Sequence, residues 1–437
     1  MPAPAAKRVP PAFADHLDHL KRIREAALEA ADPAKAVDRA FHLHGDEIRL
    51  PGARLRLAGR LWVVAFGKAA VPMSRAFTEA VHDRFAGGVA AAPAEAVAGV
   101  PAGIEPFAGG HPLPSEGSLA AGERVARMLQ STTKEDIVLA LVSGGGSAML
   151  ELPVPGVSLK DLQAVNRLLL RSGLPIHEVN LVRSALSQIK AGGLARLAAP
   201  AQVVALVLSD VPGDDPAAVA SGPTVPRPDV RRRARGLLHR AGLWDSLPAG
   251  VRSALAAPTP RRAWMPQPLT RVVASNRRAT RAAAEAAGLL GFQVHRVAAP
   301  VEGEAQFAAH RLAARLLHRP SGCGLIAGGE TTVTFQSAGR GGRNQELALQ
   351  AALDLEGQRD IAWMAFATDG LDGPTDAAGA IVTGMTAAEI RRRGIDPEAA
   401  LQAHDSYPAL DSAGALLRTG PTGTNVADLI VGLRYAS

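Results

Sequence analysis

The stretch from Ile137 to Ser147, IVLALVSGGGS, joins a run of apolar residues to a loop of glycine and serine. The apolar and β-branched residues 137–142 predict a fully buried strand. The loop that follows consists of Ser143, Gly144, Gly145, Gly146 and Ser147. Glycine lets the backbone turn sharply and bring its N–H groups close to a ligand, and the serines add hydroxyl donors. At the carboxyl end of a buried α/β strand we expect such a loop to bind an anionic group, usually phosphate; a tight turn without a ligand is the alternative.

The length and composition of the chain limit its class. Its 437 residues are too many for one ordinary core and predict two domains. No stretch of 18 or more residues is apolar and uncharged, and the N-terminal residues lack the apolar segment of a secretory signal. A single cysteine, Cys323, excludes an intramolecular disulfide and argues against a cysteine-based zinc site. We therefore expect a cytoplasmic protein without a membrane partner.

The charge of the chain is positive but does not indicate nucleic-acid binding. The net charge is +7, and of the 48 basic residues only seven are lysine, which together with the alanine content is typical of a biased genome. The densest basic run, Arg231 to Arg233 with Arg235, has no interleaved aromatic residues and is interpreted as a solvated helix face. A modest positive field favours small anionic substrates.

Strand and helix patterns alternate along the chain and predict an α/β protein with a parallel, doubly wound sheet. The expected strands are residues 61–66, 137–142, 203–208, 271–274, 293–298, 324–327 and 361–367. Residues 331–336 are expected to form a hairpin with 324–327. Residues 223–268 are rich in proline and arginine, and they are interpreted as a helical connection and a candidate domain boundary.

Polar or charged loops follow several of the expected strands. They are residues 67–68, 143–147, 209–215, 328–330 and 368–376. Because the carboxyl ends of parallel strands meet at one edge of a sheet, these loops are expected to line a single ligand crevice.

Three groups of charged residues in these loops are candidates for chemistry. Lys68 follows a buried strand, and its ammonium group could neutralise the charge of a phosphate or a substrate carboxylate. The alternative is that Lys68 only caps the end of the strand. Asp210, Asp214 and Asp215 form one acidic cluster, and Asp369, Asp372 and Asp376 form another. Each cluster could supply a general base or magnesium ligands, or could serve only the turn. Asp210 is the first choice for the base, because it lies at the end of a buried strand.

A basic, glycine-rich turn at residues 339–346 opens an expected helix. Two arginines and the helix N–H groups there predict an anion site that includes Arg343, whereas Glu346 could instead cap the helix and pair locally. His111, between Gly110 and Pro112, is interpreted as structural. The sequence contains neither GxxxxGK[ST] nor a G-x-G-x-x-G after a strand, which excludes a P-loop kinase and disfavours a standard dinucleotide fold.

The chain resembles the glycerate 2-kinase family, the class II glycerate kinases, over about residues 15–434. The resemblance is carried by AFGKAA (65–70), GGHPLP (109–114), SGGGSAML (143–150), SDVPGDD (209–215), ASGPTVPRPD (220–229), GGETTVT (328–334), GRGGRNQELAL (339–349), ATDGLDGPTDAAGA (367–380) and TGPTGTNVADL (419–429). It implies ATP- and magnesium-dependent phosphorylation of D-glycerate at the 2-hydroxyl. It also implies a Rossmann-like domain at 13–262, a MOFRL-type α/β domain with a mixed sheet at 263–437, and an active site in the cleft between them.

The resemblance also suggests roles for individual residues. Lys68 and Arg343 match the usual catalytic candidates, and replacing either is expected to leave a folded protein with little turnover. The expected substrate- or nucleotide-binding residues are Ser143, Gly144, Gly145, Gly146, Ser147, Asp214, Glu330, Asn344, Glu346, Thr422 and Asn425. Asp369, Asp372 and Asp376 are the expected magnesium ligands. The expected partners are ATP and D-glycerate, in a monomer or a homodimer. The alternatives are an NAD(P)H-dependent hydroxypyruvate reductase, against which the missing dinucleotide fingerprint counts, and a non-catalytic nucleotide-binding protein.

Overall fold

The computed structural model describes residues 12–82, 84–258, 265–334 and 339–436. The chain forms two compact units. Pro33–Ala274 make up one, called here the central unit, and Met1–Asp32 together with Ser275–Ser437 make up the other, called the terminal unit. The expected boundary at residues 262 and 263 lies outside the described residues, and the compact units instead change at 32/33 and 274/275.

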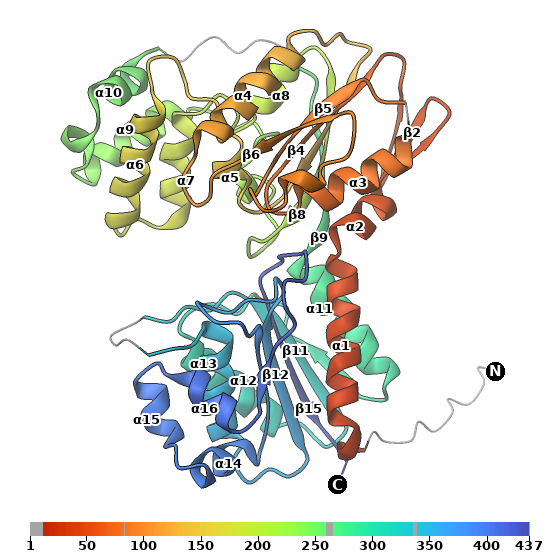
Figure 1. The fold of residues 1–437 in the computed structure, drawn as a ribbon, viewed down its shortest axis with the longest axis vertical. Helices are drawn as coiled ribbons and strands as arrows, with labels where there is room; N and C mark the ends of the chain where they lie inside the picture. The colour runs from red at the N-terminus through yellow and green to blue at the C-terminus, as the bar shows by residue number, and fades with distance from the viewer. Residues whose placement is uncertain (1–11, 83, 259–264, 335–338, 437) are drawn as a thin grey trace. The chain divides into compact units, whose positions relative to one another are not determined.

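The central unit is built on a sheet of six strands (Figure 1). In sheet order they are β6 (Ile104–Ala108), β5 (Gly87–Ala92), β4 (Leu61–Phe66), β7 (Ile137–Val142), β8 (Gln202–Ser209) and β9 (Leu269–Ser275). The ladders that join β6 through β8 are all parallel. This is the strand order of a doubly wound Rossmann-type sheet, as predicted, and the order reverses between β4 and β7. Ligands of such sheets bind outside the carboxyl ends of the strands at that reversal.

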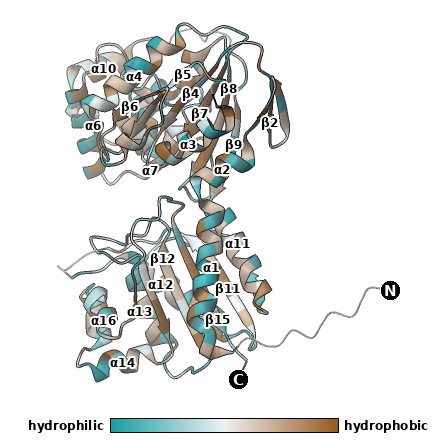
Figure 2. Ribbon diagram, turned by 45° about the vertical axis from the view of Figure 1, so that its right-hand side comes forward, coloured by the Kyte–Doolittle hydropathy of each residue, from teal (hydrophilic) through white to brown (hydrophobic). Residues whose placement is uncertain are grey.

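Helices cover both faces of this sheet. Val64 and Phe66 of β4 share one apolar cluster with Val125 of α4 (Glu116–Leu129) and Leu194 of α8 (Gly193–Ala198). On the other face lie α2 (Pro33–Ala40) and α3 (Ala70–Val81) (Figure 1). The strands are the most apolar part of the unit (Figure 2), because a parallel sheet is buried on both sides. A small antiparallel sheet of β1 (His42–His44), β2 (Glu47–Leu50) and β3 (Ala53–Arg56) completes it.

The arginine-rich segment 223–268 belongs to the central unit and is not a boundary. Its helices are α9 (Val230–Arg240) and α10 (Ala249–Ala256), which confirms the helical part of the prediction. Their Leu238 and Val251 are fully buried in an apolar cluster with α6 (Leu159–Arg171) and α7 (Ile176–Ala185). The leucine and valine spacing therefore builds a second small core, while the arginines lie on the outer face.

The terminal unit contains a second sheet of six strands, and this one is mixed, as predicted. Its order is β10 (Gln293–Arg296), β11 (Cys323–Gly329), β15 (Asp428–Arg434), β12 (Ile361–Ala367), β13 (Gly379–Thr383) and β14 (Leu416–Leu417). Only the β10–β11 pair of these described strands is parallel. The expected hairpin is wrong, because β11 pairs with β10 and β15; residues 335 and 336 lie outside the described residues.

Two helices from distant parts of the chain pack together in the terminal unit. They are α1 (His16–Ala31) and α11 (Asn276–Leu289), which lie side by side (Figure 1). In α1, Leu20, Ile23 and Ala27 recur every three or four residues and are fully buried. This stripe explains why α1 belongs to the terminal unit, whereas the sequence placed it in the first domain. The other helices are α12 (Ala305–Leu317), α13 (Arg343–Asp354), α14 (Thr386–Arg392), α15 (Pro397–Gln402) and α16 (Ser406–Ser412). None of the helices in the described part of the chain is long and apolar enough to cross a membrane.

Candidate active site

The glycine loop after β7 is held against the loop after β4. Gly67 has φ +109°, and a Cβ at this position would lie 2.4 Å from Ser143 Oγ, so only glycine fits. The backbone N–H of Lys68 donates to Gly144 O at 2.9 Å, and that of Ala69 donates to Ser143 Oγ at 3.0 Å. These bonds fix both loops at the carboxyl edge of the sheet, where the sequence placed the ligand crevice, and at the reversal of strand order.

Three side chains surround this loop, each from the carboxyl end of a different strand. A Cβ on Gly145 would lie 3.2 Å from His111 Cδ2 and 3.4 Å from Lys68 Cγ. A Cβ on Gly144 would lie 2.0 Å from Asp210 Oδ2. The structure therefore brings together Lys68, Asp210 and the glycine loop, and it adds His111, which the sequence indicated as structural.

Asp210 differs from its acidic neighbours. Burial raises the pKa of its carboxyl group, opposed by a backbone hydrogen bond and by the charge of Lys68. Asp214 is a turn residue with φ +58°, and its N–H donates to Val211 O. The exposed Asp215 accepts from Ala217 N and lies 3.8 Å from Arg227. Of this cluster, only Asp210 is shown next to the glycine loop.

Several buried polar side chains that were not predicted from the sequence lie close to Ser147. Ser147 Oγ is 3.0 Å from Ser221 Oγ, and Ser221 has a left-handed backbone with φ +62°. Nearby, the buried Lys190 forms an ion pair with the buried Glu151, which also accepts from Ser187 Oγ. The sequence around Lys190 does not predict this ion pair, because its partner Glu151 is 39 residues away.

In the terminal unit, Arg343 is the first residue of α13 and forms a two-pronged ion pair. Its Nε donates to Asp428 Oδ2 at 2.6 Å and its Nη2 to Asp428 Oδ1 at 2.8 Å. Its Nη1 lies 3.3 Å from Glu330 Oε1. Burial opposes the charge on Arg343, but the hydrogen bonds to Asp428, together with the charges of Asp428, Glu330 and Asp372, outweigh it and raise the pKa of the guanidinium. The structure thus brings Arg343 and Glu330 together and adds Asp428, which the sequence analysis did not single out.

The predicted three-carboxylate magnesium site is not formed. Asp372 accepts from Asn344 N at 3.1 Å and Gln345 N at 2.9 Å, and so caps the first turn of α13. The exposed Asp376 accepts from Tyr407 Oη and Arg418 Nε. Within the described ranges, no group of three His, Cys, Asp or Glu residues could hold a metal ion. Helix capping and surface pairing with distant residues account for two of the three aspartates, and neither is the local turn role considered as the alternative.

We expect the buried Asp372 to make stability depend on pH. Burial and the charge of Asp428 raise the pKa of Asp372 from 3.8 to about 6, so the folded state binds this proton more tightly than the unfolded state. The resulting stabilisation is present at low pH and is lost as the pH rises through 6. Between pH 4 and pH 7, the free energy of unfolding of the wild type should fall by about 2 kcal/mol relative to Asp372→Asn. Denaturant unfolding of both proteins measures this, and identical pH dependences would contradict it.

The other predicted binding residues divide into two groups. Glu346 is buried and pairs with Gln306 Nε2 at 2.8 Å and His404 Nδ1 at 2.9 Å, partners 40 and 58 residues away and not the local ones considered as its alternative. Asn344 donates to Asp372 Oδ1 at 3.2 Å. Thr422 and Asn425 instead lie in the segment that leads into β15, where Thr422 N donates to Asp369 O at the end of β12. Asp369 itself is half-buried, and its carboxylate accepts from Leu371 N at 3.2 Å.

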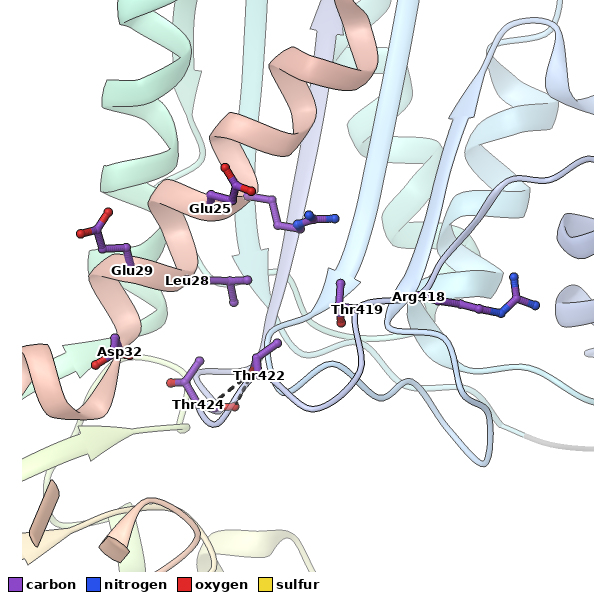
Figure 3. A pocket seen from close by; sticks show the side chains of 9 residues that line it. Glu25, Leu28, Glu29, Asp32, Arg418, Thr419, Thr422 and Thr424 are labelled. Carbon is purple, nitrogen blue, oxygen red and sulfur yellow. Dashed lines mark hydrogen bonds between the residues drawn. The ribbon is translucent and has the colours of Figure 1, made fainter. Parts of the chain in front are cut away.

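A pocket of about 480 Å³ adjoins Thr422 (Figure 3). One wall is α1, with Glu25, Leu28 and Glu29, and the residue after it, Asp32; the other wall is the segment with Arg418, Thr419, Thr422 and Thr424. Leu28 points toward Thr422 and Thr424, whereas Arg418 points away (Figure 3). At this pocket Thr424 Oγ1 donates a hydrogen bond to Ala31 O, 2.7 Å long, which ties the segment to the end of α1.

Two family models and several known proteins match this chain. Residues 19–256 match the model of a domain of unknown function, DUF4147, and residues 323–428 match the MOFRL family. The chain is 38% identical over 433 residues to the glycerate 2-kinase of Pyrococcus horikoshii, covering 94% of this chain and 96% of that protein. It is 39% identical over 408 residues to the D-glycerate 2-kinase of Thermotoga maritima, covering 91% and 96%.

One further relative and one crystal structure are also similar to this chain. A protein of Agrobacterium vitis, named provisionally as a hydroxypyruvate reductase, is 41% identical over 422 residues, covering 94% of this chain and 92% of that protein. The crystal structure of glycerate kinase from Thermotoga maritima matches with a TM-score of 0.88 at 38% identity, covering 96% of this chain and 100% of that one.

Proposed function

Because this chain belongs to the glycerate 2-kinase family, we propose that it transfers the γ-phosphoryl group of ATP to the 2-hydroxyl of D-glycerate, giving 2-phosphoglycerate and ADP. One observation carries the mechanism: Lys68 and Asp210 flank a glycine loop at the reversal of strand order. Phosphoryl transfer requires positioning and neutralisation of charge more than covalent chemistry by the protein. N–H groups of the glycine loop, a cation and a carboxylate supply these requirements.

We assign the steps as follows. The glycine loop binds phosphate oxygens through its N–H groups, and Lys68 neutralises the charge on the transferred group. Asp210 accepts the proton of the 2-hydroxyl while the hydroxyl oxygen of D-glycerate attacks the γ-phosphorus. The bond between the γ-phosphorus and the bridging oxygen breaks, and ADP leaves. Arg343 is proposed to contact the nucleotide or the substrate through Nη1, because Nε and Nη2 are bound to Asp428; Nη1 would then exchange its ion pair with the half-exposed Glu330 for the ligand.

Magnesium would be held mainly by ATP. In such sites Mg²⁺ binds one or two carboxylates together with substrate phosphates, so a three-carboxylate cage is not required. Asp369 fits this role best, because Asp372 and Asp376 are engaged in capping and surface pairing. When bound, the ion would neutralise phosphate charge.

The decisive experiment is an ATP-dependent assay on D-glycerate that identifies the product as 2- or 3-phosphoglycerate. The proposal predicts ADP release with formation of 2-phosphoglycerate. Absence of ADP release at several magnesium concentrations would overturn it. The name of the Agrobacterium vitis relative makes hydroxypyruvate reduction the alternative, and oxidation of NADH or NADPH at a comparable rate would favour that activity.

The pH dependence of turnover tests the role of Asp210. A general base must be ionised, and burial raises the pKa of Asp210 above the usual range of an aspartate. We therefore expect kcat/KM to fall as the pH drops through this raised pKa, above the pH at which an ordinary aspartate would titrate. Asp210→Asn should lower kcat by about 10²–10⁴-fold and abolish this acid limb. A variant that keeps the limb would assign it to another group.

A further inference from the structure

Arg183 on α7 lies beside the glycine loop and has no role in the proposed steps. Its Nη2 donates to Pro112 O, at a length of 3.4 Å, in the loop that carries His111. Together with Ser147, Glu151 and Pro114, Arg183 lines a small cavity next to the start of α5 (Gly146–Met149). This position places a half-buried guanidinium close to the loop proposed to bind phosphate.

The charge of Arg183 is not balanced by a dedicated carboxylate. Across the described ranges it forms no ion pair, and the carboxylate that acts on it is Glu151. Glu151 is already bound by Lys190 and by Ser187. Burial lowers the pKa of Arg183, yet a guanidinium stays charged in proteins. A half-buried cation with one long contact to a carbonyl favours an anionic ligand.

The neighbours of Arg183 show where such a ligand would lie. Burial, and then the charges of Lys68 and Arg183, lower the pKa of His111, so both cations act on this imidazole from close by. Lys68 and His111 are exposed, which leaves this side of the glycine loop open. The site therefore offers two cations, a flexible ammonium and a planar guanidinium.

We propose that Arg183 binds the carboxylate of the acceptor and makes the enzyme select a hydroxy acid over a neutral alcohol. This assignment rests on the proposed function, in which the site must hold both a phosphate and a carboxylate. A compact ammonium suits the transferred phosphoryl group, whereas a guanidinium fork matches the planar carboxylate with two parallel hydrogen bonds. The carboxylate is bonded to the carbon that bears the reacting hydroxyl, so its capture also orients the attacking oxygen.

The test compares D-glycerate with D-glyceramide, whose neutral amide replaces the carboxylate. The wild type should prefer D-glycerate in kcat/KM by about 100-fold or more, because the amide leaves the guanidinium without its anion. Arg183→Met should lose most of this preference through a higher KM and a lower kcat for D-glycerate, with KM for ATP changed less than about threefold. Arg183→Lys, which keeps the charge but not the fork, should be intermediate.

Two controls separate this assignment from loss of structure and from failure of the proposed function. Arg171→Met removes the same charge from the exposed end of α6 and should behave as the wild type. If the wild type turns over neither acceptor, calorimetric binding of both compounds without ATP still measures the preference. Weaker binding of D-glycerate to Arg183→Met, but not to Arg171→Met, would support the assignment. An unchanged preference, an equal loss for both acceptors, or no binding of D-glycerate to the wild type would overturn it.

Discussion

Replacing Lys68 by methionine is expected to lower kcat for D-glycerate by about 10²–10³-fold and to leave the fold intact. The reason is that its ammonium group neutralises charge that develops during phosphoryl transfer. The fold should survive because the side chain is exposed, and because the bond from Lys68 N to Gly144 O involves only the backbone. ADP release at saturating substrates measures the loss, and thermal unfolding checks the fold. Lys134→Met, which removes an exposed lysine paired with Glu135, is the matched control.

Lys68→Met should also change the pH dependence of the residual activity, which misfolding alone would not do. The charge of Lys68 lowers the pKa of Asp210 against the effect of burial. Without this charge the pKa of Asp210 rises further, so the acid limb of the residual activity should move to higher pH. Wild-type turnover in Lys68→Met would remove the residue from the mechanism. A reduced rate with an unshifted limb would separate Lys68 from Asp210.

The part of the site that the sequence predicted best is the part formed by local pattern. The apolar run before the glycine loop predicts β7 with its observed bounds, Ile137–Val142, and strand endings alone predict that Lys68, Ser143 and Asp210 come together. In contrast, β5 has the sequence GGVAAA, and β6 is five residues long and contains a proline. Neither resembles a β-branched strand, so the position of His111 after β6 was not predicted.

Partners far apart in the sequence were the main source of error. The stripe on α1 predicts a helix with one buried face, but it cannot specify that this face packs against α11 in the terminal unit. Likewise, the spacing of Asp369, Asp372 and Asp376 does not distinguish a ligand set from a helix cap. The backbone N–H groups that Asp372 caps are 27 and 28 residues away.

Arg343 shows how such a distant partner changes an expected result. The sequence predicts an anion site at Arg343, and the family resemblance implies a catalytic arginine whose removal leaves a folded protein. The structure instead pairs Arg343 with Asp428, which is 85 residues away and 2% exposed at the start of β15. Removing one partner of a buried pair leaves the other charge without compensation, which typically costs about 3–5 kcal/mol. We therefore expect Arg343→Met to lose stability as well as turnover.

The pH dependence of Arg343→Met identifies the cause of this loss. Burial raises the pKa of Asp428, and Arg343 opposes that rise. Without Arg343 the pKa of Asp428 rises further, so the variant is least destabilised at low pH, where Asp428 is protonated, and loses stability as the pH increases. Denaturant unfolding from pH 5 to pH 8 should show a widening gap from the wild type. The exposed Arg359→Met serves as the charge control.

A second substitution separates the structural role of Arg343 from its proposed catalytic role. In Arg343→Met with Asp428→Asn the buried carboxylate that lost its partner is gone, so most of the stability should return and the gap from the wild type should no longer widen with pH. Turnover should stay low in this double variant if Arg343 also contacts the nucleotide or the substrate. Recovery of both stability and turnover would show that Arg343 acts only by holding β15 to α13. A single variant as stable as the wild type at pH 8 would contradict the buried ion pair itself.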